Sequence, residues 1–364
     1  MKQLSPNARI AFVLIIIFAL ALSGCKTPIA PPALPDVTAS AKPTFVVEAS
    51  PAPTGVYAEL SAMLDSCEPA FSLTLRGDDM ENIDEFIDWL MRRDEVRAAS
   101  YNYTTYIGRI EIEFTITYAM GYRLIYAYRG GDRAMLTGDE RAALDEAQRV
   151  IASVIEPGMS DYEKEKAIHD YIVTTCDYSG ADNSAAYNPY GVLIDKRAVC
   201  DGYSSTFKLF MDMLNIECAI VGGYADGEAH SWNLIRIEGE WYWLDVTWDD
   251  PVYADNQIVD DVIRYDWFNV TDDAINKTHV LDEAASVSCT ATKHNYFYYN
   301  NLVANDKAEL RAVFIDGETQ NKAYLSVYYT GATLSVDEVC ALFPSSVNRY
   351  SFGRDMRIIT VLYK

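Results

Sequence analysis

Hydrophobic and polar residues alternate strictly over residues 110–118. This alternation predicts a β-strand with one face in the core and the other in water. A strand pattern over residues 70–76 comes earlier in the chain. Between them, residues 78–92 carry apolar side chains at three- and four-residue steps, and Asp78 with Glu81 resembles a helix N-cap pair. The sequence therefore predicts strands and one amphipathic helix in this region.

The C-terminal stretch has the same order of patterns. Residues 323–330 are typical of a strand, and Ser335 with Glu338 forms a capping box before a short apolar run. Residues 349–352 and 357–363 are typical of two further strands. We therefore expect a small strand-helix-strand-strand module at each end of the folded body. The similarity lies in pattern and not in residue identity, so a true repeat and an accidental likeness both stay open.

The segment between these modules has a different pattern. Thr137 with Glu140, and Ser160 with Glu163, each form a capping box in front of an amphipathic helix. A third helical stretch and a strand-rich block over residues 218–247 follow. Helical and strand patterns both occur along the chain, and the fold class expected is α+β.

The first 24 residues have the pattern of a signal peptide. Two basic residues precede an apolar run over residues 10–22, which is too short to span a hydrocarbon core. The Leu-Ser-Gly-Cys sequence at residues 22–25 resembles the lipobox of bacterial lipoproteins, in which the cysteine becomes the lipid-bearing N-terminus. We therefore expect Cys25 to carry lipid, palmitate included, and to anchor the protein outside the bacterial cell membrane. Ordinary secretion with an incidental Cys25 is the alternative.

Proline is concentrated directly after this signal. Seven of the 13 prolines fall within residues 26–56, so this stretch is expected to stay extended and to act as a tether. The expected organisation is a signal peptide, a lipidated cysteine with its Pro-rich tether, an N-terminal α+β module, a central domain and a C-terminal α+β module. Their limits are residues 1–24, 25–56, 57–135, 136–300 and 301–364.

Composition excludes several classes of function. The chain has 53 acidic and 30 basic residues and a formal net charge of −23, which repels phosphate backbones, so no nucleic-acid partner is expected. Four histidines and seven scattered cysteines without a CxxC pair argue against a zinc module. GxGxxG, GxxxxGK[ST] and HExxH motifs are also absent from the sequence. We therefore expect neither a cofactor nor a metal.

Three short segments carry candidate chemistry. Cys200 stands where a helix would start, and a helix N-terminus favours the thiolate, which is the nucleophilic form of a thiol. An imidazole such as that of His230 can take the thiol proton and later protonate a leaving group. A carboxylate such as that of Asp245 can fix the tautomer and orientation of the imidazole. Cys200, His230 and Asp245 are therefore a sufficient set for acyl transfer.

These segments are similar to the three motifs of the bacterial transglutaminase-like family, within the papain-like cysteine-enzyme superfamily. They are Ala-Val-Cys-Asp-Gly-Tyr-Ser, His-Ser-Trp-Asn and Trp-Tyr-Trp-Leu-Asp-Val-Thr-Trp-Asp-Asp-Pro. The resemblance runs over residues 139–299. It implies a papain/transglutaminase-like core with Cys200 as the nucleophile, His230 as the base and Asp245 as its orienter.

The resemblance leaves the direction of the reaction open. The expected function is a surface-anchored thiol enzyme that attacks an amide or isopeptide carbonyl through a thioester, which water resolves in a protease or amidase and an amine in a transglutaminase. The substrate would be a peptide or protein, with cell-wall peptide as one candidate. The alternative is a catalytically inactive lipoprotein of the cell envelope that binds peptides or glycans.

Other polar residues receive weaker interpretations. His169 and His279 have family-like surroundings and are interpreted as structural, whereas His294 has no assigned partner. Tyr190 is a candidate for an oxyanion site, together with the backbone N–H of Cys200. Five further cysteines are widely spaced and do not suggest a disulfide scaffold. They are Cys67, Cys176, Cys218, Cys289 and Cys340, of which Cys218 is expected in a buried strand.

The register of one hairpin can be predicted. Residues 230–237 and 241–247 are two strand patterns joined by Glu-Gly-Glu, which predicts a two-residue loop that includes Gly239. In the register that follows, His230 and Asp245 are diagonal neighbours on one face. A slip of one residue would place them on opposite faces. We therefore expect this face to meet the N-terminus of the helix that carries the thiol.

Overall fold

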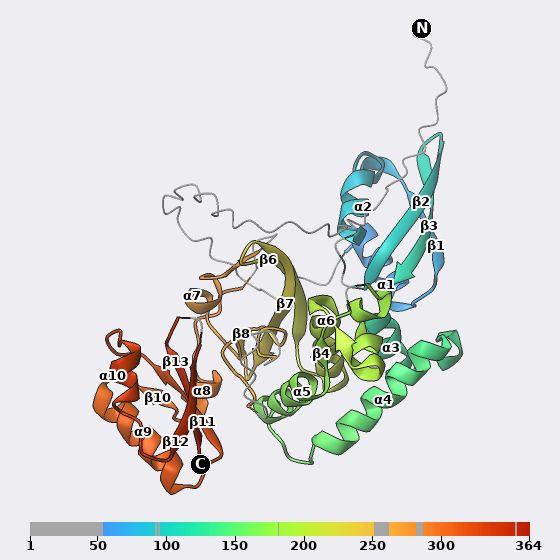
Figure 1. Ribbon diagram of the computed structural model, residues 1–364. Helices are drawn as coiled ribbons and strands as arrows, with labels where there is room; N and C mark the ends of the chain where they lie inside the picture. Colours follow the sequence, from blue (N-terminus) through green and yellow to red (C-terminus); the bar gives the residue numbers. More distant parts are fainter. Residues whose placement is uncertain are drawn as a thin grey trace, which may run out of the picture.

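The computed structural model describes residues 54–364 except residues 92, 94, 181, 251–261, 282–286 and 354. The N-terminal unit and the C-terminal unit lie on opposite sides of a central unit (Figure 1). Each unit has its own cluster of buried hydrophobic side chains. The predicted signal peptide and nearly all of the tether, Cys25 included, lie outside the described residues. Within the described part of the chain, no helix has the length and apolar character needed to cross a membrane.

The N-terminal unit is a three-stranded antiparallel sheet with two helices. The strand order is β1-β3-β2, and the buried Ile112, Phe114 and Ile116 of β3 alternate with exposed residues as predicted. Its elements are α1 (Val56–Asp65), β1 (Ala70–Leu75), η1 (Gly77–Glu81), α2 (Ile83–Met91), β2 (Val96–Tyr106) and β3 (Arg109–Tyr118).

The helix predicted over residues 78–92 is interrupted. A 3-10 turn, η1, comes first, and α2 starts only after Asn82. Asn82 has non-helical backbone angles, its side-chain amide donates to the carbonyl of Asp78, and its own carbonyl accepts from the amides of Glu85 and Phe86. Asparagine competes in this way with regular helical hydrogen bonds, which explains the break.

The C-terminal unit has the same topology. In the set β1, β2 and β3 and in the set β11, β12 and β13, the first strand pairs antiparallel with the third, the third pairs antiparallel with the second, and one helix directly precedes the first strand. The strand-helix-strand-strand order predicted for both ends is thus present. A short parallel strand, β10, extends the C-terminal sheet. The elements are β10 (Val303–Ala304), α9 (Lys307–Thr319), β11 (Tyr324–Tyr329), α10 (Val336–Cys340), β12 (Val347–Phe352) and β13 (Ile358–Tyr363).

The central unit combines four main helices with an antiparallel sheet of order β8-β7-β6-β9. The fold is therefore of the predicted α+β class. The helices are α3 (Met120–Tyr128), α4 (Gly138–Val154), α5 (Asp161–Thr175) and α6 (Cys200–Met213). The strands of the sheet are β6 (Cys218–Ala225), β7 (Glu228–Ile237), β8 (Glu240–Leu244) and β9 (His279–Leu281).

Smaller elements connect these. They are η2 (Arg133–Met135), β4 (Asp177–Tyr178), η3 (Ser184–Tyr187), η4 (Gly191–Asp195), β5 (Arg197–Ala198), α7 (Asp272–Ile275) and α8 (Tyr296–Tyr299).

Helix α6 lies at the centre of this unit. It contacts β6 and β7 on one side and α3 and α5 on others. Tyr203, Phe207 and Phe210 are fully buried along it. Burial of each such side chain contributes roughly 2 kcal/mol to stability. The helix that begins at Cys200 is therefore firmly fixed in the core.

A buried ion pair connects α3 to the start of α4. The Arg123 guanidinium donates to both carboxylate oxygens of Glu140, at 2.6 and 3.1 Å, and to the carbonyl of Met135. Burial alone would raise the pKa of Glu140, but Arg123 and Thr137 hold it below its usual value. Glu140 also completes the predicted capping box with Thr137. The carboxylate therefore depends on Arg123 for its charge balance.

We expect Arg123→Met to lower the free energy of unfolding by about 3 kcal/mol, because it leaves the Glu140 carboxylate buried without its cation. Urea denaturation would measure the change. Arg133→Met is the matched control, since it removes an exposed ion pair with Asp145 and should cost less than about 1 kcal/mol. Equal effects of the two variants would contradict the prediction.

Candidate active site

Cys200 is the first residue of α6, as predicted, and is partly exposed. The preceding residue, Val199, donates its N–H to the carbonyl of Ala186 in η3. A Cβ on Gly202 would clash with this same carbonyl oxygen and would lie 2.7 Å from the Cβ of Ala198. Glycine at position 202 therefore lets the start of the helix lie against η3, and this contact fixes the position of the thiol.

His230 lies on β7, and the hairpin that carries it has the predicted register. Ile237 pairs with Glu240, and the two loop residues, Glu238 and Gly239, have φ of 49° and 90°. Two positive φ values are typical of the turns that join antiparallel strands through two residues. This register runs to the pair Asn233–Leu244, so the end of β8 that leads into Asp245 lies beside β7.

The predicted strand over residues 241–247 ends early, at Leu244. The chain turns there because the Asp245 carboxylate accepts hydrogen bonds from the backbone N–H groups of Thr247 and Trp248, at 3.0 and 3.2 Å. The N–H of Asp249 also donates to the Asp245 carbonyl. A carboxylate that binds backbone amides two and three residues ahead replaces strand pairing with a turn.

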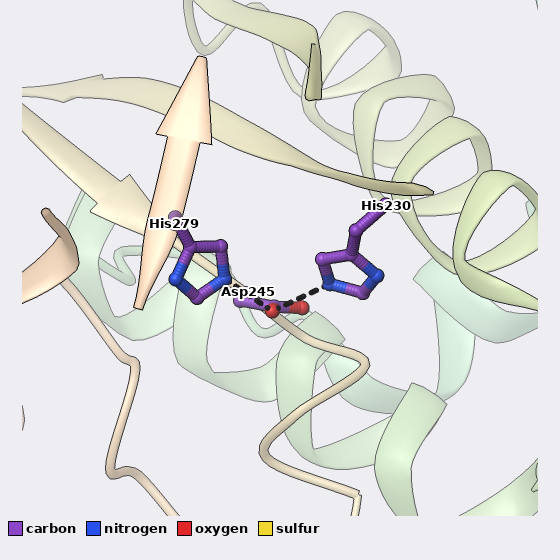
Figure 2. A group of neighbouring side chains, drawn as sticks. All are labelled: His230, Asp245 and His279. Carbon is purple, nitrogen blue, oxygen red and sulfur yellow. Dashed lines mark hydrogen bonds and ion pairs between the residues drawn. The ribbon is translucent and has the colours of Figure 1, made fainter. Parts of the chain in front are cut away.

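Two imidazole rings approach the Asp245 carboxylate from opposite sides (Figure 2). Nε2 of His230 lies 2.8 Å from Oδ2, and Nε2 of His279 lies 3.1 Å from the same oxygen. Asp245 is fully buried. Burial alone would raise its pKa, but the two histidines lower it to about 2. Asp245 is therefore a carboxylate anion across the physiological range.

The Cys200 side chain lies close enough to His230 to affect the pKa of its imidazole. Burial alone would lower the pKa of His230, but the charge of Asp245 and the contact with Cys200 raise it to about 10. Since Asp245 occupies Nε2, the other ring nitrogen, Nδ1, is the one available to exchange a proton with the thiol. The structure thus brings the three predicted residues together from α6, β7 and the end of β8.

The same three groups raise the question of a metal. The ligand-type atoms of His230, Asp245 and His279 lie within 4.8 Å of one another, and two imidazoles with a carboxylate are a set that zinc accepts. Direct hydrogen bonds between these side chains already account for their spacing. The geometry therefore does not require an ion.

Two further acidic residues hold the turn that follows Asp245. Asp249 contacts Nε2 of the buried His169 at 3.1 Å and accepts the N–H of Trp267 at 2.9 Å. Asp250 accepts the hydroxyl of Tyr203, on α6, at 2.5 Å. The carbonyl of Trp267 in turn accepts the N–H of Asp245. His169 therefore supports this turn through its contact with Asp249, in line with its interpretation as a structural residue.

The remaining sequence interpretations have mixed outcomes. His279 was expected to be merely structural, but it contacts Asp245 directly. His294, which lacked a partner in the sequence, is buried beside the Tyr242 hydroxyl at 3.1 Å. Tyr190 packs against the central core, and its oxyanion role stays a prediction. None of the six cysteines in the described segments forms a disulfide, and Cys218 is buried in β6 as expected.

Comparison with known proteins agrees with this geometry. The model of the transglutaminase-like superfamily matches residues 148–246. Kyphoscoliosis peptidase from Homo sapiens is 26% identical over 124 residues, which are 30% of this chain and 18% of the relative. The Mus musculus protein of the same name is 25% identical over 115 residues, 27% of this chain and 17% of the relative. The chain thus matches less than a fifth of the length of these curated relatives.

Solved structures with some similarity include the crystal structure of a TGase, with 15% identity, 54% of each chain covered and a TM-score of 0.29. The periplasmic domain of TgpA from Pseudomonas aeruginosa has 14% identity and a TM-score of 0.24, over 42% of this chain and 63% of that one.

Residues 148–246 thus match the model of the transglutaminase-like superfamily, whose members are cysteine peptidases or transglutaminases. The match covers the segment that brings Cys200, His230 and Asp245 together, whereas the two flanking units lie outside it.

The raised pKa of His230 predicts a pH dependence of stability. An unfolded histidine titrates near pH ~6.5. The protonated imidazole therefore stabilises the folded state fully below that pH, and this contribution is lost as the pH rises through about 10. We expect the difference in melting temperature between the wild type and His230→Gln to shrink as the pH rises through this window. Circular dichroism at several pH values would measure it, and a difference that grows with pH would contradict the assignment.

Proposed function

We propose that Cys200, His230 and Asp245 form a catalytic triad that attacks an amide or isopeptide carbonyl in a peptide or protein substrate. The observation that carries this proposal is the position of His230, whose Nε2 lies 2.8 Å from the buried Asp245 carboxylate and whose pKa is raised in part by the neighbouring Cys200. A nucleophile, a base and an orienter that lie together are the parts that thiol acyl transfer needs.

The proposed steps follow from these contacts. The Cys200 sulfur attacks the carbonyl carbon, and its proton goes to His230. His230 then gives this proton to the leaving amine as the C–N bond breaks, which leaves a thioester on Cys200. Water or a second amine then attacks the thioester carbonyl and gives a proton to His230. The C–S bond breaks, the Cys200 sulfur takes this proton back, and a carboxylic acid or a new amide leaves. Asp245 stabilises the imidazolium in both halves and keeps the proton of Nε2 directed at itself.

Water is the resolving nucleophile that we favour. The curated relatives are named peptidases, which supports hydrolysis. Transfer to an amine remains the second outcome of the same thioester.

We expect iodoacetamide to alkylate Cys200 faster than any other described cysteine at neutral pH, and His230→Ala to slow this reaction at least tenfold, because the base is lost. Burial raises the pKa of Cys67 to about 11 and that of Cys176 to about 12, so these thiols stay protonated and serve as internal references. Mass spectrometry of tryptic peptides would measure the alkylation of each cysteine separately. Slow labelling of Cys200, like that of an ordinary thiol, would favour the inactive binding protein instead.

The resolving step needs its own measurement. Incubation with a peptide library and a labelled primary amine, followed by mass spectrometry, would report hydrolysed and amine-linked products side by side. Comparison with Cys200→Ala would show which products depend on the thiol. New peptide termini alone support a peptidase or amidase, and incorporated amine supports a transglutaminase.

We further propose that lipid on Cys25 anchors the enzyme outside the cell membrane, with residues 26–56 as the tether. The support is the signal-like pattern of residues 1–24, the Leu-Ser-Gly-Cys sequence and the proline content. A net charge of −23 also keeps such an enzyme away from nucleic acid.

We expect Cys25→Ser to release the protein from the membrane fraction or to leave the precursor uncleaved, because serine has no thiol for the lipid. Cell fractionation and the electrophoretic mobility of the protein would measure this. Cys340→Ser is the control, since it removes a cysteine far from the signal sequence. Identical fractionation and mobility of Cys25→Ser and the wild type would rule out the lipid anchor.

A further inference from the structure

We propose that His279 is a positioning residue of the active site, which fixes the Asp245 carboxylate in the orientation that His230 needs. This inference rests on the triad proposed above. It concerns a residue outside the segment that matches the superfamily, since that match ends at residue 246.

The first argument is the set of donors around Asp245. Oδ1 accepts the backbone N–H groups of Thr247 and Trp248, and Oδ2 lies within hydrogen-bond distance of both His230 and His279. Two imidazoles thus share one oxygen atom. With His279 in place, a rotation of the Asp245 carboxylate would break the contact with His279 as well as the contact with His230. The direction in which Oδ2 meets His230 is therefore fixed.

The second argument is the tautomer of His279. The Thr278 hydroxyl lies 2.9 Å from Nδ1 of His279. When this hydroxyl donates to Nδ1, the ring proton must be on Nε2, which is the nitrogen that faces Asp245. The Thr278 hydroxyl also lies 3.5 Å from the carbonyl of Ile275, so it does not by itself fix the tautomer. The ionised Asp245 carboxylate can only accept, and His279 must therefore donate to it through Nε2.

The third argument is confinement. The ring of His279 lies 4.8 Å from Trp232, 4.6 Å from Trp248 and 5.0 Å from Trp267, measured between ring centroids. Its backbone is held in β9, where His279 pairs with Ala225 of β6. Only 2% of the residue is exposed. A ring so enclosed cannot exchange its contact with Asp245 for water, so the hydrogen bond is maintained.

The charged and titratable groups near His279 are few among the described residues. Asp245 is in direct contact, and His230 lies 5.7 Å away between ring centroids. The three tryptophans and Thr278 that surround the ring are neutral. Loss of His279 should therefore act on the thiol through Asp245 and His230.

Two variants separate donation from packing. His279→Gln keeps an N–H donor near the position of Nε2, whereas His279→Phe fills the space without a donor. His294→Phe is the matched control, because His294 is also buried in this unit but contacts Tyr242 and not the triad. The measurement is the rate of Cys200 alkylation by iodoacetamide as a function of pH, with melting temperatures to verify folding.

Without the His279 donor, Oδ2 of Asp245 loses one of its two contacts and is held less firmly toward His230. The His230 imidazolium is then less stabilised, and the thiol keeps its proton to higher pH. We expect His279→Phe to move the midpoint of the pH–rate profile upward by about one unit, which is about a tenfold loss of rate below the midpoint. His279→Gln should retain most of the wild-type rate, and His294→Phe should match the wild type.

The outcomes keep this inference distinct from the triad proposal. A wild-type profile in His279→Phe, with the thiol still dependent on His230, would overturn the role of His279 alone. Equal losses in His279→Phe and His279→Gln would also overturn it, because the effect would then lie in packing. A wild-type Cys200 that reacts like a free thiol would instead refute the triad itself.

Discussion

The carboxylate of Asp245 is the charge on which the arrangement of the central unit depends. A fully buried anion is strongly destabilising unless hydrogen-bond donors surround it. Here the donors come from three places: its own turn, β7 through His230, and β9 through His279. The hairpin must therefore close in one register, and β9 must return to the sheet beside β6, before this charge is balanced. The need to balance the charge of Asp245 thus fixes the register of the hairpin and also orients the His230 imidazole.

The turn after Asp245 extends this constraint to the helices. Asp249 holds His169 of α5, and Asp250 holds Tyr203 of α6, the helix that begins with Cys200. Three acidic residues within one turn thus join the sheet to both helices. Burial alone would lower the pKa of His169, but its carboxylate neighbours Asp170 and Asp249 raise it to about 9, whereas burial raises the pKa of Asp249 to about 7. The distance between thiol and imidazole is therefore set by buried polar contacts as well as by apolar packing.

Features with a local cause could be predicted from the sequence. The three capping boxes, the alternation in β3 and the hairpin register all depend on residues a few positions apart, and Gly239 alone defined the loop. The end of β8 at Leu244 could not be predicted in this way, because the Asp245 side chain replaces the strand partner. The contact between His279 and Asp245 was also missed. It joins residues 34 positions apart, and no periodicity or turn signal marks a return of the chain at that distance.

The flanking units show how far this chemistry depends on the rest of the chain. Both have the same strand order, yet neither supplies a residue to the described contacts of Asp245, which all come from the central unit. The N-terminal unit is nevertheless attached to the central unit through α3. The helix α3 follows the N-terminal sheet, but its Leu124 and Ile125 belong to the buried cluster of the central unit, and Arg123 ties it to α4. Since α3 also packs on α6, a displacement of the N-terminal sheet would shift the helix that begins at Cys200. The N-terminal unit is therefore coupled to the site through packing, without taking part in its proton transfers.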